Sequence, residues 1–361
     1  MLSIRWRRLG ARLLVAACVG AAAGALAQSL PKYDGPDRMD KLAAAAKREG
    51  EVTIYTSTPV EDIKVLTDAF ERKYGVRTNV WRASSEKVLQ RAVTEARAGR
   101  FDVDVFETNG PELEAMVREK LLAPVETPAA RDMLPEAVLP HRQWIGTRLV
   151  IFAFAYNTSL VQKSELPTTY EGFADPRWKG RLGIEAEDAD WFATVTGLLG
   201  EANAERTFRA IVATNGVSVR KGHTLLANLV ASGEVPLALT VYNYKAEQLK
   251  NKGAPIDWFV LPPAIARVNG VGVAAKAPHP NAALLFREFA IGLEGQKLLL
   301  SRDFVPTNRN VETPLNRFPL RFVDSRAAVE DSAKWAKRYA DIFGAQSRQL
   351  VMPLDHLTLP A

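Results

Sequence analysis

Two tyrosines, Tyr242 and Tyr244, stand one residue apart at the end of an apolar run in the stretch LTVYNYKAEQ. If this run is a strand, both phenols point to the same face at its carboxyl end. Phenolate oxygens suit a hard cation such as ferric iron, because a bound cation lowers the phenol pKa from about 10. Two other interpretations stay open. One tyrosine ring could pack in the core while the other tyrosine forms a hydrogen bond at the rim of the core. Alternatively, both could contact an anionic or organic solute.

Polar residues also follow two extended runs earlier in the chain: Thr56, Ser57 and Thr58 after the first, and Thr108, Asn109 and Gly110 after the third. Each group stands where a helix is expected to begin, and hydroxyls together with backbone N–H groups there can bind an anion. Thr58, which precedes Pro59, could instead cap the helix, and Asn109 could belong to a turn.

A cluster of four acids follows another expected strand, in IEAEDADWF: Glu185, Glu187, Asp188 and Asp190. Carboxylate oxygens of this kind could hold a cation, but we favour a solvated, acidic helix start. Downstream, Arg220 and Lys221 could balance an anion or lie in solvent, with the polar His223 close to them. The four histidines do not have the spacing of a metal-binding pair.

Alternating helical and extended patterns from residue 36 onward must position these side chains. The spacing of Ile63, Leu66, Phe70 and Tyr74 predicts a helix that ends at Gly75, and Pro111 predicts the start of another. Strands that alternate with helices of this length predict parallel βαβ units covered by helices. Residues 149–156 form a long apolar run without an adjacent helix, after which a second α/β set begins.

The first 27 residues have the pattern of a secretory signal peptide. Four arginines precede an apolar run that ends in Ala25-Leu26-Ala27, so we expect cleavage after Ala27. The run is shorter than the ~20 residues that a spanning helix needs. Cleavage before Cys18, as in a lipoprotein, is an alternative, but it would leave a short apolar region.

Loss of this segment changes the chemistry of the chain. Residues 1–27 carry four Arg and no Asp or Glu, so their removal lowers the formal net charge from +6 to +2. A nearly neutral protein gives little support to nucleic-acid binding. Cys18 is the single cysteine, so the mature chain has no thiol for catalysis, disulfides or metal binding. Neither a Ser-His-Asp arrangement nor a Gly-rich nucleophile turn is evident, and we do not expect an enzyme.

Several segments, in this order, resemble a known family: GRFDVDVFETNGPELEAM, FADPRWKGRLGI, ASGEVPLAL, KGAPIDWFVLPP and KAPHPNAALLFREFAIGLEGQKLL. They resemble the family 1 extracellular solute-binding proteins of ABC importers, and among these the ferric-iron-type periplasmic binding proteins. The similarity covers about residues 51–310. It implies a type II periplasmic binding protein fold, with two doubly wound α/β lobes joined by crossover hinge strands and a ligand in the cleft between them.

The resemblance also implies boundaries. Residues 28–148 and about 270–310 would form a discontinuous N-terminal lobe, and residues 157–260 the C-terminal lobe. Residues 149–156 and about 261–269 would be the hinge crossovers. The remaining residues, 311–361, would form an irregular and helical segment that packs on the lobes.

The implied function is periplasmic capture of a solute and its delivery to an ABC permease and its ATPase. We expect a monomer without an enzymatic cofactor or nucleic-acid partner. Ferric iron, Fe(III), is the first expected ligand, held by Tyr242 and Tyr244. Relatives commonly place two such tyrosines adjacent and supply a histidine after the first strand, whereas Asn243 separates them here and Thr56 to Pro59 stand in the histidine's place.

The alternatives are a phosphonate, carboxylate or amine bound without metal, and a ligand sensor instead of a transporter. The expected ligand contacts are Thr56, Ser57, Thr58, Asn109, Glu187, Arg220, Tyr242 and Tyr244.

Overall fold

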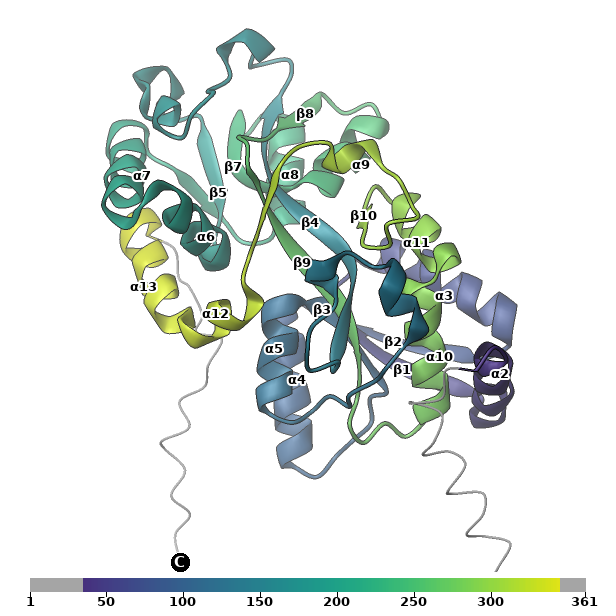
Figure 1. The fold of residues 1–361 in the computed structure, drawn as a ribbon. Helices are drawn as coiled ribbons and strands as arrows, with labels where there is room; N and C mark the ends of the chain where they lie inside the picture. The colour runs from purple at the N-terminus through teal and green to yellow at the C-terminus, as the bar shows by residue number, and fades with distance from the viewer. Residues whose placement is uncertain (1–34, 345–361) are drawn as a thin grey trace, which may run out of the picture.

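The computed structural model describes residues 35–344 (Figure 1). The α-helices are α2 (Arg38–Glu49), α3 (Val60–Tyr74), α4 (Ser85–Arg97), α5 (Gly110–Arg118), α6 (Ala189–Leu199), α7 (Glu201–Asn215), α8 (His223–Ser232), α9 (Asn243–Asn251), α10 (Pro280–Ile291), α11 (Leu293–Leu300), α12 (Ser325–Glu330) and α13 (Ser332–Phe343). The strands are β1 (Glu51–Thr56), β2 (Arg77–Arg82), β3 (Val105–Asn109), β4 (Trp144–Asn157), β5 (Leu182–Glu185), β6 (Ser218–Arg220), β7 (Leu237–Tyr242), β8 (Ile256–Phe259), β9 (Ala264–Val273), β10 (Val305–Pro306) and β11 (Leu320–Phe322).

Helix boundaries follow the local signals of the sequence. The helix predicted to end at Gly75 is α3, and Gly75 has the left-handed φ of 65° that a glycine adopts without strain. Pro111 stands in the first turn of α5, where its missing N–H costs nothing. Both predictions are confirmed.

The strands form one continuous mixed sheet in the order β2-β1-β3-β9-β4-β7-β5-β6. Strands β1, β2 and β3 pair in parallel at one end, and β5, β6 and β7 pair in parallel at the other. Between them β9 and β4 run antiparallel to their neighbours. The predicted parallel βαβ units are therefore confirmed at both ends, and the two long central strands connect them.

The apolar core divides into two parts along these central strands, which gives two lobes. The first lobe has a core around Ile54, Phe70 and Phe286, and the second has cores around Phe208 and Val241. The boundary falls within β4, where Ile151 belongs to the first core and the next residue to the second. Figure 1 shows the corresponding arrangement, with β4 and β9 running from one group of helices to the other.

The exact lobe boundaries expected from the sequence remain a prediction. The expected signal peptide, including Cys18, and the end of the C-terminal segment beyond residue 344 lie outside the described residues. Within residues 35–344, no helix combines the length and apolar character that crossing a membrane requires.

The C-terminal segment returns across both lobes. Strand β11 pairs in parallel with the start of β9. Helix α12 then packs against α5 of the first lobe, whereas α13 packs against α6 and α7 of the second. In Figure 1 this segment is the yellow ribbon that passes from α12 to α13 beside α6.

Candidate functional site

A cleft of about 450 Å³ lies between the lobes and is lined by residues of both. Most of its wall consists of helix starts: α3, α4 and α5 from the first lobe, and α6, α8 and α9 from the second. These helices follow strands, so the cleft lies at the carboxyl ends of the strands, where open α/β sheets bind ligands. Free N–H groups of the first helical turns favour anions at such positions.

Most of the expected contact residues lie in this wall. The cleft is lined by Ser57, Thr58, Asn109, Glu187, Tyr242 and Tyr244. The lining does not include Thr56, which is fully buried behind it, or Arg220, which bonds to Glu234 at 3.3 Å on the surface. Six of the eight expected residues therefore line the cleft, and their contact with a ligand remains a prediction.

Thr58 belongs to a buried polar network around Glu107. Its hydroxyl donates to Glu107 Oε2 at 2.7 Å and accepts from Arg148 Nη2 at 2.7 Å. Thr56 donates to the same carboxylate oxygen, and Arg148 Nη1 pairs with the other oxygen. We call these four residues the Glu107 network. The capping interpretation of Thr58 is wrong, because Pro59 is the N-cap of α3 and no side chain caps it.

Asn109 connects three elements of the first lobe. Its amide donates to Ser85 Oγ at 2.8 Å, and its carbonyl accepts from the Asn269 amide at 2.8 Å. Asn109 is the last residue of β3, so it holds the starts of α4 and α5 against β9.

The two tyrosines lie together, but not for the reason the sequence suggested. Strand β7 ends at Tyr242, and Tyr244 stands in the first turn of α9, so a shared strand face is not what joins them. Their rings nevertheless stack at a centroid distance of 6.0 Å. Tyr244 also packs on Phe304, and Tyr242 Oη accepts a hydrogen bond from Arg267.

Burial raises the pKa of both phenols above their ordinary value. The nearby guanidinium of Arg267 opposes this shift at Tyr242, and that of Arg148 opposes it at Tyr244. Both phenols are therefore neutral at neutral pH until a cation binds beside them.

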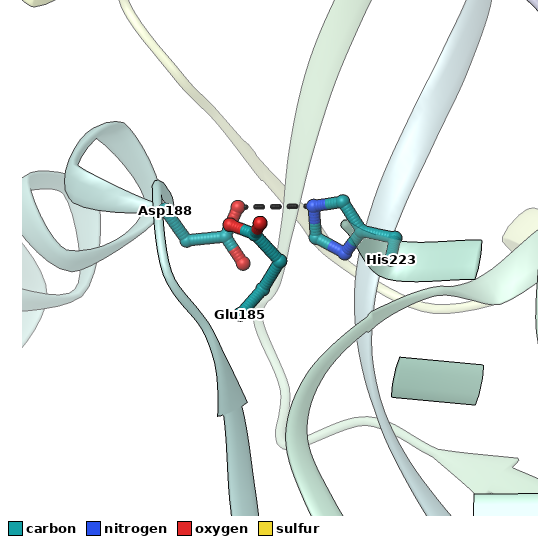
Figure 2. Close-up of side chains that lie close together, drawn as sticks. All are labelled: Glu185, Asp188 and His223. Atoms are coloured by element: carbon teal, nitrogen blue, oxygen red, sulfur yellow. Dashed lines mark hydrogen bonds and ion pairs between the residues drawn. The ribbon is translucent and has the colours of Figure 1, made fainter. Parts of the chain in front are cut away.

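Three side chains of types that can ligate a metal converge in the second lobe, as Figure 2 shows. One ligand atom from each of Glu185, Asp188 and His223 lies within 4.8 Å of the others. His223 Nε2 is 3.1 Å from Asp188 Oδ1, and the imidazole stacks on the Tyr242 ring at 3.4 Å between centroids. Carboxylate and imidazole groups in this arrangement could hold a metal ion.

Backbone N–H groups bond to this cluster, and Arg267 bonds to two side chains next to it, Asp190 and Tyr242. Glu185 accepts from the backbone N–H groups of Glu187 at 2.5 Å and Gly222 at 2.7 Å. Burial and the adjacent Asp188 raise the pKa of Glu185. Arg267 Nη1 donates to Asp190 Oδ2 at 2.8 Å. Together with Tyr242, these acids, His223 and Arg267 form what we call the His223 network: Glu185, Asp188, Asp190, His223, Tyr242 and Arg267.

Many buried polar atoms in the cleft wall have no hydrogen-bond partner among the described residues: Glu112 Oε2, Arg148 Nε, Asp188 Oδ2, His223 Nδ1, Arg267 Nε, Asn269 Oδ1 and Ser332 Oγ. Buried polar atoms are nearly always bonded in folded proteins, so a group of exceptions needs an explanation. Because these atoms lie around one cleft, a solute or water that enters it could supply the missing partners.

Glu112 contributes one of these unpartnered atoms from the first lobe. It stands in the first turn of α5 and is only 4% accessible. Burial, reinforced by the charge of Glu86, raises its pKa to about 8, although Arg267 opposes the shift. The carboxyl therefore holds its proton at neutral pH and can donate a hydrogen bond, and a cationic ligand would favour its ionised form.

Sequence reasoning missed several residues of the wall, among them Glu112, Arg148, Arg267 and Asn269. A signal for two of them exists, because Arg148 and Arg267 are the charged residues of two mostly apolar strands and are 3% and 5% accessible. A buried arginine is rare unless it is paired, so an arginine inside an apolar strand marks a polar network. Glu112 and Asn269 carry no comparable signal.

Comparison with known proteins shows similarity in sequence and in fold. The family model for bacterial extracellular solute-binding proteins matches residues 66–316, so α12 and α13 lie beyond the match. A curated relative, the Fe(3+)-binding periplasmic protein of Serratia marcescens, is 25% identical over 72% of this chain and 79% of its own length.

Two solved structures share the fold. Iron-bound HitA from Pseudomonas aeruginosa is similar with a TM-score of 0.70 and 22% identity, over 81% of this chain and 99% of its own. AfuA from Actinobacillus pleuropneumoniae, with exogenous fructose-6-phosphate bound, has a TM-score of 0.72 and 22% identity, over 82% and 99% of the two chains. The same fold therefore accommodates a metal ion in one protein and a sugar phosphate in another.

Proposed function

This chain belongs to the bacterial extracellular solute-binding protein family, and we propose that it is the periplasmic binding component of an ABC importer. It captures a solute in the cleft and delivers it to a membrane permease that an ATPase drives. The observation that carries the proposal is the group of unpartnered buried atoms around the cleft, contributed by both lobes. The family whose model matches the chain is one of binding proteins, not of enzymes.

Capture follows from contacts made by both lobes at once. A solute that bonds to Glu112 on one side and to Asp188 on the other stabilises the closed arrangement over the open one. Strands β4 and β9 pass between the lobes and are the segments about which closure takes place. We infer that the protein is exported by its signal peptide and acts as a monomer.

Ferric iron is the first candidate ligand. Tyr242 and Tyr244 offer phenolates once a cation lowers their pKa, and Asp188 and His223 stand beside Tyr242 with spare lone pairs. An accompanying anion would bind the Ser57 hydroxyl, which lines the cleft just before α3. Relatives such as the Serratia protein carry iron in their names, which supports this choice.

A small anionic or organic solute without metal is the second candidate, and one observation favours it. Arg267 donates to the hydroxyl oxygen of Tyr242 and so occupies a lone pair that a metal ion would need. With Arg148 and Arg267 both offering an unpartnered Nε, the cleft could bind a phosphate or carboxylate directly. A sensor that binds the same solute would share this site and would differ only in its membrane partner.

The experiment adds ferric citrate to protein purified from the periplasm. We expect a visible tyrosinate-to-iron band and a rise in melting temperature, both lost in Tyr242→Phe. Tyr74→Phe is the matched control, because Tyr74 lies on α3 and packs against Phe70 away from the cleft. If neither the band nor the shift appears with iron, the ferric assignment is rejected; stabilisation by a sugar phosphate or phosphonate would then support the second candidate.

A further inference from the structure

The C-terminal helices are anchored to both lobes. On the first lobe, Glu330 of α12 pairs with Arg118 of α5 at 2.8 Å. On the second lobe, Arg338 of α13 pairs with Glu201 at 2.9 Å and with Glu205 at 3.1 Å. We call residues 325–343 the C-terminal strap.

Buried contacts reinforce these surface ion pairs. Val329 belongs to the core of the first lobe, whereas Tyr339 and Phe343 belong to that of the second. The Tyr339 hydroxyl also donates to the backbone carbonyl of Glu185 at 2.6 Å. The strap is therefore bonded directly to the strand that carries one member of the His223 network.

One face of the strap looks into the cleft. Four residues of the strap line the cleft: Ala328, Ser332, Trp335 and Ala336. Ser332 is 6% accessible, and its hydroxyl is one of the unpartnered buried atoms. Trp335 packs edge-on against Phe192 at 6.1 Å, which orients its indole at the border of the cleft.

We propose that the C-terminal strap is a third wall of the binding cleft and that Ser332 and Trp335 contact the captured solute. Ser332 supplies a hydrogen bond and Trp335 an apolar surface. This inference rests on the proposed function and narrows the class of ligand. A cleft of about 450 Å³ has the size used for small organic ligands, so a solute that reaches three walls is an organic molecule or a chelated metal, not a bare ion.

The first test measures the affinity for ferric citrate by calorimetry. We expect Ser332→Ala to weaken binding roughly fivefold to tenfold, as loss of one hydrogen bond does, and Trp335→Phe to weaken it less. Lys337→Ala is the matched control from the same helix, because its side chain is 75% exposed. If both strap variants bind as tightly as the control, the proposal is overturned.

A second test does not depend on ligand identity and decides the matter if ferric citrate fails to bind. The mature chain has no cysteine, so Ser332→Cys and Lys337→Cys each introduce a single thiol. A thiol facing the cleft should react with a small thiosulfonate reagent but not with a polymer-linked maleimide, whereas the thiol at 337 should react with both. Reaction at 332 with both reagents, or with neither, would overturn the proposal. Failure of ferric citrate alone would count against iron only.

Discussion

Two buried charge networks lie at the cleft, one in each lobe, and they differ in how completely they are bonded. In the Glu107 network both carboxylate oxygens are occupied, by Thr56, Thr58 and Arg148. In the His223 network Asp188 Oδ2, His223 Nδ1 and Arg267 Nε have no partner among the described residues. Only Arg148 Nε is left over in the first network.

This difference in hydrogen bonding distinguishes a network that stabilises the fold from one that binds a ligand. A buried charge that is fully bonded stabilises its surroundings only as long as every partner stays, because removing one leaves the other uncompensated. A buried group with a spare lone pair or proton has already been desolvated and is ready to bond a ligand. We therefore assign the Glu107 network, apart from the unpartnered Nε of Arg148, to the stability of the first lobe and the His223 network to recognition.

The largest effect is expected from a substitution that breaks the Glu107 network. Arg148→Ala leaves the Glu107 carboxylate, which is 2% accessible, without its counter-charge. We expect the free energy of unfolding to fall by about 3–5 kcal/mol, measured by urea denaturation. The double variant Glu107→Gln/Arg148→Met removes both charges and should recover part of the loss. An equal or greater loss in the double variant would contradict this explanation.

An intermediate effect concerns Glu112, whose pKa in the folded protein is about 8 against an ordinary value of 4.5. Between these values the folded state keeps a proton that the unfolded state has lost, so stability falls as pH rises from 4.5 towards 8. Glu112→Gln lacks this dependence.

Relative to wild type, we expect Glu112→Gln to gain about 2–5 kcal/mol in unfolding free energy between pH 5 and pH 8.5. Comparing the two proteins at each pH cancels the titration of most other groups. A constant difference between them across this range would show that Glu112 titrates normally.

The smallest effect is expected at the exposed rim. Lys221 pairs with Glu187 at 2.5 Å, but its side chain is 55% exposed. Pairs of this kind contribute little, so Lys221→Ala should change the unfolding free energy by less than about 1 kcal/mol. A loss as large as that of Arg148→Ala would remove the distinction between rim and buried charges.

Much of the fold could be predicted from the sequence because its signals are local. Gly75 and Pro111 mark helix ends through their backbone preferences alone, and the alternation of strands and helices predicts parallel units. The two long central strands are recognisable as an apolar run without a helix. Their antiparallel pairing with strands of both lobes depends on contacts between distant segments, which no local pattern encodes.

The site was less predictable, since it depends on which residues meet. Tyr242 could be placed at the end of a strand, but its bond to Arg267 joins residues from different elements. His223 looked isolated in the sequence, and only the fold brings it beside Asp188. Thr56 illustrates the opposite error, because it stands beside Ser57 in sequence but points into the first lobe and away from the cleft.

The most direct test of the central claim compares solute binding by wild type and Asp188→Asn. Thermal-shift titrations with ferric citrate, phosphonates and sugar phosphates should find a solute that stabilises wild type, because it binds the folded state. The same solute should bind Asp188→Asn at least tenfold more weakly, whereas Asp257→Asn, whose aspartate pairs with Lys250 outside the cleft, should bind it normally. Equal stabilisation of all three proteins, or stabilisation by none of the solutes, would contradict the assignment of the His223 network to recognition.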